Sequence, residues 1–329
     1  MKLRGIDFGR VWGASGIQGF FGEGYPFHGA FKAFFGGLFS FDGMTFVAKT
    51  MTLNPREGNM PRKDDGITPR EWRPTCICLT PRMWKKGIVL NAVGLSNPGA
   101  EALLETGRWH ARREPFFLSF MAMRKTPSER LQELEAFVAL LARHLSYFQT
   151  RCGLQINLSC PNVGIHPEEL VEEACDMLSA ASSRGIPLAV KVNVLVPPQV
   201  AGEIAAHAAC NAICISNSIP WGALPDRIDW VKLFGSKDSP LAKFGGGGLS
   251  GAPLLPLVAE WIREARRAGV KKHINGGGGI LHPRDVRMLH NAGADSIAIG
   301  SLAILRPWRL RAVIRAAQRE FPNTYHERR

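Results

Sequence analysis

The fold is decided by a stretch that reads LQINLSCPNVGIHPEELVEEACDMLSAASSRGIPLAVKV over residues 154–192. Residues 154–158 form a short, largely apolar run. A helical pattern begins near Pro167 and stops at Gly185, a residue suited to the position just after a helix end. Pro187 then opens a second apolar run at 188–192. This order predicts two parallel strands joined by a crossover helix.

The same alternation extends through the chain. Thr126, Pro127 and Glu129 have the spacing of an N-cap, a first-turn proline and a capping box, which predicts another helix start. The aromatic-rich residues 27–41 are expected to form the first barrel helix. Eight runs have the length of strands: 10–14, 45–49, 116–120, 154–158, 188–192, 212–216, 272–275 and 296–299. Eight strand–helix units favour an α/β fold closed as a (β/α)8 TIM barrel, with a doubly wound open sheet as the alternative.

The segment from 50 to about 107 is too long for an ordinary barrel loop. It contains two more strand-like runs, 76–79 and 88–90, which we expect over the C-terminal mouth of the barrel. No linker or low-complexity segment interrupts the chain. The sequence therefore predicts a single domain over residues 1–329, with an insertion at about 50–107.

Composition limits the class of protein. With 45% hydrophobic and 21% charged residues, the chain is neither disordered, collagen-like nor a coiled coil. Its formal net charge of +13 favours anionic ligands. It has no apolar stretch of about 18 residues, and its N-terminus lacks the pattern of a signal peptide, so we expect no membrane span.

The seven cysteines are an odd number and indicate free thiols in a reducing, cytoplasmic location. Cys76 and Cys78 share one face of a predicted strand. No second pair of Cys or His stands at zinc spacing, so packing is their expected role and no metal site is predicted.

Polar residues follow many of the predicted strands. In a closed α/β barrel the chemistry lies at the carboxyl ends of the strands, so these residues are expected to converge at one mouth. They are Ala14, Ser15 and Gly16 after the first strand, Lys49 at the end of the second, Asn157 and Cys160 after the fourth, Lys191 in the fifth, and Asn217 and Ser218 after the sixth.

Glycine-rich turns follow the last two predicted strands, at 276–279 and 300–301, and a further glycine run covers 245–248. Glycines let the backbone approach a phosphate, and the loops after strands seven and eight are the usual phosphate site of such barrels. The chain has no GxxxxGK[ST] motif, so a P-loop is not expected.

Lys49 and Lys191 stand in otherwise apolar strands. A buried ammonium without an anion is costly, so each needs an anionic partner at the mouth. A reduced flavin and a carboxylate substrate are two such partners.

Cys160 directly follows a strand, and Pro161 stops that strand from continuing. Asn157 and Asn162 flank it and suit ring amides and carbonyls. A thiolate at a lysine-rich mouth can serve as a general base, although a lone cysteine is more often a small buried hydrophobe.

The chain resembles the dihydroorotate dehydrogenases, which are FMN-containing (β/α)8 barrels of pyrimidine biosynthesis. The matching pieces occur in family order and cover nearly the whole chain. They are ASG at 14–16, KTMT at 49–52 with PREGN at 55–59, NAVGLSN at 91–97, NLSCPN at 157–162, VK at 190–191, NSI at 217–219, GGLSG at 247–251, GGGI at 277–280 and IGS at 299–301.

This resemblance implies the oxidation of dihydroorotate to orotate, with Cys160 taking the C5 proton while C6 gives a hydride to flavin N5. The implied substrate-binding residues are Lys49, Asn91, Val93, Gly94, Leu95, Asn157, Asn162, Asn217 and Ser218. The implied FMN-binding residues are Ala14, Ser15, Gly16, Lys49, Thr50, Asn91, Asn157, Lys191, Ser216, Gly248, Gly278, Gly279, Gly300 and Ser301.

A cysteine base is typical of the soluble class 1 enzymes, whereas the quinone-using class 2 carries serine there and an N-terminal helical extension. The chain departs from the family at Pro220 and Trp221, and the bulky Trp221 leaves the exact pyrimidine open. The main alternative is a tRNA dihydrouridine synthase or another FMN-dependent pyrimidine oxidoreductase, although nucleic acid is not the expected partner. The electron acceptor, a homodimer and an electron-transfer partner subunit stay open.

Overall fold

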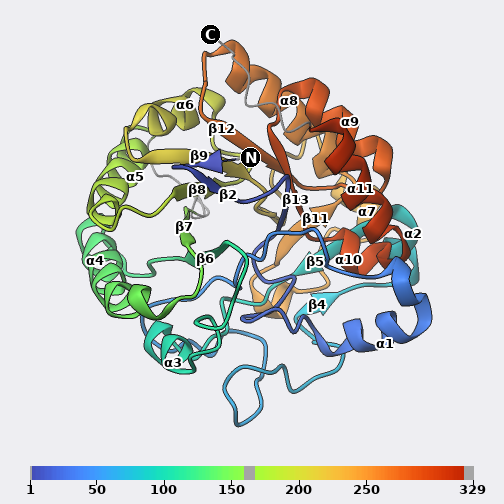
Figure 1. Ribbon diagram of the computed structural model, residues 1–329. Helices are drawn as coiled ribbons and strands as arrows, with labels where there is room; N and C mark the ends of the chain where they lie inside the picture. Colours follow the sequence, from blue (N-terminus) through green and yellow to red (C-terminus); the bar gives the residue numbers. More distant parts are fainter. Residues whose placement is uncertain (1, 159–166, 322–329) are drawn as a thin grey trace.

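The computed structural model describes residues 2–158 and 167–321. Within them, a parallel sheet curls into a barrel that is ringed by helices (Figure 1). Its strands, in spatial order, are β3 (Val11–Gly13), β13 (Ser296–Ile299), β12 (His273–Gly277), β9 (Cys210–Ile215), β8 (Leu188–Val192), β7 (Cys152–Asn157) and β6 (Phe116–Phe120).

The segment that contains the predicted strand at 45–49 closes the barrel between β3 and β6, but it is not a continuous strand. Thr45 makes an isolated parallel bridge to β3, and Val47 and Met51 make isolated parallel bridges to β6. Regular pairing fails because the Lys49 amide donates to the Gly19 carbonyl at 2.9 Å instead of to a neighbouring strand. The closure confirms the TIM barrel over the open sheet.

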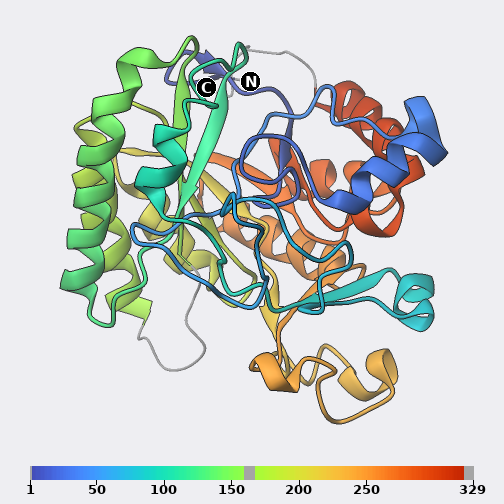
Figure 2. The same cartoon turned by 90° about the horizontal axis from the view of Figure 1, so that it is seen from below.

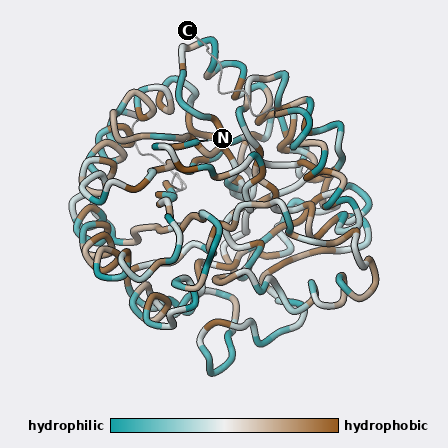
Figure 3. The backbone as a smooth tube through the Cα atoms, viewed as in Figure 1, coloured by the Kyte–Doolittle hydropathy of each residue, from teal (hydrophilic) through white to brown (hydrophobic). Residues whose placement is uncertain are grey.

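The outer helices cover the barrel as the sequence predicts. They are α4 (Pro127–His144), α5 (Pro167–Ser182), α6 (Pro198–Ala206), α8 (Leu254–Arg267), α9 (Pro283–Ala292) and α11 (Leu310–Glu320). Thr126 caps α4 and forms the predicted capping box with Glu129. Hydrophilic and hydrophobic residues alternate along these helices (Figure 3), as expected where one helix face packs on the strands.

The first helix is shorter than predicted. Residues 27–41 were expected to be helical, whereas α1 spans Pro26–Phe35 and is followed by the 3-10 turn η1 (Gly36–Leu38). The helix ends because Gly36 adopts a positive φ of 49°.

A second, antiparallel sheet contains β10 (Ile219–Pro220), β11 (Gly248–Gly251), β5 (Ile88–Asn91) and β4 (Ile77–Cys78). The predicted strands at 76–79 and 88–90 are thus confirmed as β4 and β5. The short helices α2 (Pro81–Lys86) and α7 (Trp230–Phe234) accompany this sheet at the end of the barrel opposite the hairpin of β1 (Lys2–Leu3) and β2 (Ile6–Asp7), as Figure 2 shows. The remaining helical elements are α3 (Ala100–Glu105), α10 (Leu302–Leu305), η2 (Leu145–Tyr147), η3 (Ala242–Phe244) and η4 (Pro307–Arg309).

An aromatic cluster fills the amino-terminal half of the barrel interior. Phe117 stacks on Phe8 with ring centroids 4.2 Å apart and lies 4.6 Å from Trp12. All three side chains are buried. This packing closes one end of the barrel, so a ligand can enter from the carboxyl ends of the strands. Over residues 2–158 and 167–321, no helix has the length and apolar character needed to cross a membrane.

Candidate active site

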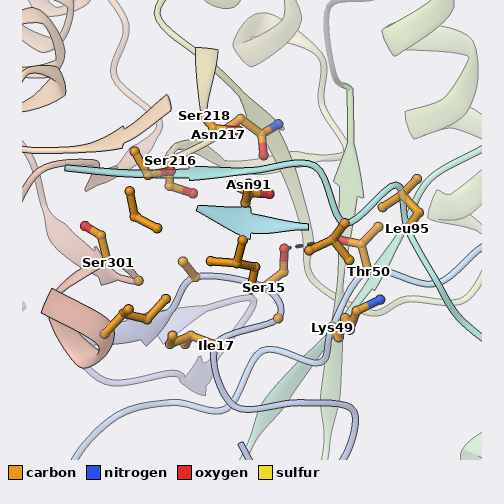
Figure 4. A pocket seen from close by; sticks show the side chains of 18 of the residues that line it. Ser15, Ile17, Lys49, Thr50, Asn91, Leu95, Ser216, Asn217, Ser218 and Ser301 are labelled. Carbon is orange, nitrogen blue, oxygen red and sulfur yellow. Dashed lines mark hydrogen bonds between the residues drawn. The ribbon is translucent and has the colours of Figure 1, made fainter. Parts of the chain in front are cut away.

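A cavity of about 310 Å³ opens at the carboxyl ends of the barrel strands. It gathers most of the residues that the sequence proposed, and Figure 4 shows their side chains arriving from separate strands and loops around one space. The predicted residues that line it are Ala14, Ser15, Gly16, Lys49, Thr50, Asn91, Val93, Gly94, Leu95, Asn157, Lys191, Ser216, Asn217, Ser218, Gly300 and Ser301.

A smaller cavity of about 60 Å³ adjoins the large one and shares Gly300 and Ser301 with it. Gly278 and Gly279 also line this small cavity, together with the first residue of α8. Gly279 has a φ of +81°, and a Cβ built on it would lie 2.7 Å from the Leu255 amide nitrogen. Glycine is therefore required for the turn to pack against the start of α8, and the backbone of this turn can approach a small ligand closely.

Lys191 points from β8 into the large cavity. Its Nζ donates to the Ser15 Oγ at 2.8 Å, and that hydroxyl is 3.0 Å from the Thr50 Oγ1, an interaction drawn in Figure 4. Burial lowers the pKa of the Lys191 ammonium to about 8. No carboxylate among the described residues forms an ion pair with it. An anion bound in the cavity would stabilise the charged form of this buried lysine.

Lys49 is a second cation on the cavity wall. Its Nζ donates to the Ser96 carbonyl and lies 4.8 Å from the centroid of the Phe20 ring. Burial, assisted by the nearby Arg62 guanidinium, lowers the pKa of Lys49 to about 7. No ion pair to a carboxylate is found for Lys49 in the described part of the chain. An anionic ligand would stabilise its charged form.

The loop that follows β5 is fixed by residues 55–59, which belong to the same insertion. The Asn59 Nδ2 donates to the Ala92 carbonyl at 2.8 Å, and the Asn59 amide donates to the Val93 carbonyl at 2.9 Å. The Arg56 Nε donates to the Gly94 carbonyl at 2.8 Å. These contacts occupy the carbonyls of the loop and fix the backbone along the cavity. The PREGN motif therefore supports the loop that lines the site.

Three of the predicted amides, Asn91, Asn157 and Asn217, line the large cavity. The Asn217 Nδ2 donates to the Asn157 Oδ1 at 2.7 Å, and the Asn91 Nδ2 donates to the Gly248 carbonyl at 3.3 Å. Gly248 itself does not line either cavity. A Cβ on Gly248 would lie 2.4 Å from the Ser218 Oγ, so this glycine allows β11 to pass close to the site.

Two predicted residues, Cys160 and Asn162, lie outside the described residues. Trp221, which the sequence placed near the ring site, instead packs against Trp230 and Phe234 and does not line the large cavity.

Sequence reasoning missed several lining residues. Tyr25 precedes α1, in a glycine- and aromatic-rich stretch without a catalytic pattern. Ile17, Ile77, Val89 and Ile304 are apolar and carried no signal beyond core packing.

The family model that matches this chain and two of its relatives carry the name dihydroorotate dehydrogenase. The family model described as Dihydroorotate dehydrogenase matches residues 19–318. The chain is 29% identical over 271 residues to the catalytic subunit of dihydroorotate dehydrogenase B (NAD(+)) of Thermoanaerobacter pseudethanolicus, covering 79% of this chain and 76% of that protein. It is 31% identical over 220 residues to dihydroorotate dehydrogenase A (fumarate) of Lactobacillus delbrueckii subsp. bulgaricus, covering 65% of this chain and 66% of that protein.

A solved structure supports the fold. The structure of the Eimeria tenella enzyme DHODH in complex with ferulenol is similar with a TM-score of 0.63 at 18% identity, covering 95% of this chain and 80% of that chain.

Proposed function

This chain belongs to the dihydroorotate dehydrogenase family, and from that premise we propose that it catalyses the FMN-dependent oxidation of dihydroorotate to orotate in pyrimidine biosynthesis. One observation carries the proposal: the mouth of the barrel holds two largely buried lysines without carboxylate partners among the described residues, together with a glycine-lined phosphate-sized pocket. We also propose that residues 1–329 act as one FMN-binding domain with its insertion at about 50–107.

The cavities fit a flavin mononucleotide. When bound, FMN supplies an N5 atom that accepts a hydride from the substrate. The glycine turns at 278–279 and 300–301 would hold its phosphate, because their backbone can approach an anion closely. Lys191, with Ser15 and Thr50 behind it, would supply positive charge to the edge of the ring that becomes negative on reduction.

The remaining polar wall suits an anionic pyrimidine. Lys49 would neutralise the ring carboxylate, and the backbone of residues 93–95 would add contacts to it. Carboxamides and hydroxyls can donate to ring carbonyls and accept from ring N–H groups. The proposed set for the ring is the carboxamides of Asn91, Asn157, Asn162 and Asn217 with the hydroxyl of Ser218.

Cys160 is the proposed base. Its thiolate would take the C5 proton of dihydroorotate as the C6 hydride leaves toward the flavin, so the substrate loses two electrons and two hydrogens and becomes orotate. Nearby ammonium groups favour the thiolate form of a cysteine. A base positioned at the carbon it deprotonates contributes about 10²–10⁴-fold to the rate.

The direct test is turnover with dihydroorotate by protein loaded with FMN, beside an unmodified, uridine-containing tRNA supplied with NADPH, which is the reaction of a tRNA dihydrouridine synthase. We expect orotate formation and no reaction with the RNA. Fumarate and NAD are both tested as acceptors, because the relatives' names include each. Reaction with the RNA alone would contradict the proposal and favour a tRNA dihydrouridine synthase.

A further inference from the structure

Tyr25 lies between two cavities at the mouth of the barrel. It lines the large cavity, and it also lines a side cavity of about 20 Å³. Gly16 and Lys49 line both cavities as well. Tyr25 is therefore a neighbour of the lysine that faces the proposed substrate, although it comes from a separate loop before α1.

The Tyr25 ring is held in place. It stacks on the Phe27 ring with centroids 5.2 Å apart and an interplanar angle of 8°. The His28 ring meets it edge-on at 5.9 Å, and the Tyr25 backbone amide donates to the His28 Nδ1 at 3.1 Å. A ring fixed by its neighbours loses little conformational freedom when its hydroxyl binds a ligand.

The Tyr25 side chain is half-buried, and its hydroxyl makes no cap hydrogen bond to the start of α1. Burial, assisted by the Cys76 thiol, raises the pKa of the Tyr25 hydroxyl. Tyr25 thus remains a neutral hydrogen-bond donor at neutral pH, and as a lining residue of the large cavity it can donate to an acceptor bound there.

We propose that the Tyr25 hydroxyl donates a hydrogen bond to the substrate carboxylate that Lys49 neutralises, and that Tyr25 therefore helps to select a carboxylated pyrimidine. This inference rests on the proposed function. Lys49 already donates one proton to the Ser96 carbonyl, whereas a carboxylate accepts about four hydrogen bonds. A neutral phenol adds a donor without adding a second charge to a largely buried site.

The test is Tyr25→Phe in the FMN-loaded protein, with orotate and uracil titrated against the flavin spectrum. Orotate should bind roughly tenfold or more weakly than to the wild type, because a charge-assisted hydrogen bond is lost. Uracil has no carboxylate, so its affinity should not change. Tyr147→Phe is the matched control, because Tyr147 is exposed and lies outside both cavities.

The outcomes separate the two claims. If orotate does not perturb the wild-type flavin, the proposed function fails. If it does, and Tyr25→Phe binds orotate as tightly as the wild type, only the role of Tyr25 is wrong. An equal loss of affinity for orotate and uracil would show that Tyr25 only shapes the cavity and does not bind the carboxylate, and it would also overturn the inference.

A measurement on the wild type covers the case in which Tyr25→Phe does not fold. The chain has three tyrosines, Tyr25, Tyr147 and Tyr325, so ¹³C labelling at the tyrosine Cζ gives three resonances. Tyr147→Phe and Tyr325→Phe assign two of them, and the third belongs to Tyr25. Orotate should shift the Tyr25 resonance and uracil should not. A Tyr25 resonance that is unchanged by saturating orotate would overturn the inference.

Discussion

Replacing Lys49 with methionine should remove most of the preference for a carboxylated ring. The Lys49 Nζ donates to the Ser96 carbonyl, which leaves two N–H donors for a ligand, and no carboxylate of the described residues competes for them. Losing one charge-assisted hydrogen bond in a desolvated site costs about 1.5–3 kcal/mol, or about 10–150-fold in affinity. Titration of orotate and uracil against the flavin spectrum measures this loss, and uracil affinity should change little.

The effect of pH provides a second readout of the same lysine. The pKa of Lys49 without ligand is about 7, and a bound carboxylate raises it. Orotate should therefore bind best at a pH below the pKa of Lys49 and more weakly as the pH rises, because a neutral Lys49 must take up a proton before it can pair with the carboxylate. At about pH 8 roughly one molecule in ten carries the charge, which predicts about tenfold weaker binding than at about pH 6.

Lys243→Met is the matched control, because Lys243 is exposed and does not line the cavity. It should leave both the affinities and the pH profile unchanged. Equal binding of orotate and uracil by the wild type would contradict the proposed role of Lys49, as would a Lys49→Met variant that keeps the wild-type preference and pH dependence.

Three further predictions concern the base, the phosphate pocket and the second lysine. Cys160→Ala should slow flavin reduction by dihydroorotate about 10²–10⁴-fold in stopped-flow traces and leave reoxidation nearly unchanged; reduction at the wild-type rate would reassign Cys160 to packing. Gly279→Ala should lose FMN on gel filtration. Gly185→Ala is the control, because Gly185 also has a positive φ but open space at its Cβ, and it should retain FMN. Equal retention of FMN by the two variants would contradict the role of Gly279 in the phosphate pocket. Burial lowers the pKa of Lys191 from 10.5 to about 8. At a pH between these two values, Lys191 is protonated in the unfolded chain but largely neutral in the folded chain. The free energy of unfolding of the flavin-free protein should therefore rise with pH across this range. Lys191→Met should flatten that rise in urea denaturation, and an unchanged slope would argue against a buried ammonium.

The parts of the fold that follow from local patterns could be predicted. The capping residues of α4 and the apolar run at 188–192 are local signals, and both elements stand where they were expected. The prediction of a regular strand at 45–49 was wrong, because the Lys49 amide donates to the Gly19 carbonyl instead of to a neighbouring strand, a contact that periodicity does not encode. The strands β10 and β11 were missed because they are short and rich in glycine or proline.

Much of the cavity lining could be predicted, because packing alone rarely places polar side chains at the ends of buried strands. Lys49 and Lys191 are examples: each interrupts an apolar run, and both line the large cavity. Tyr25 escaped because its position depends on the path of the loop before α1 and on contacts with Phe27 and His28. Aromatic residues in such a loop are usually assigned to packing, and only the structure places Tyr25 on the wall of the cavity.

The most direct test of the account is the anaerobic reaction of FMN-loaded protein with dihydroorotate, followed by the flavin absorbance and by the orotate released. The account predicts bleaching of the flavin, with one orotate formed for each flavin reduced, and recovery of the oxidised spectrum when an acceptor is added. A flavin that binds to the protein but stays oxidised in excess dihydroorotate would contradict it.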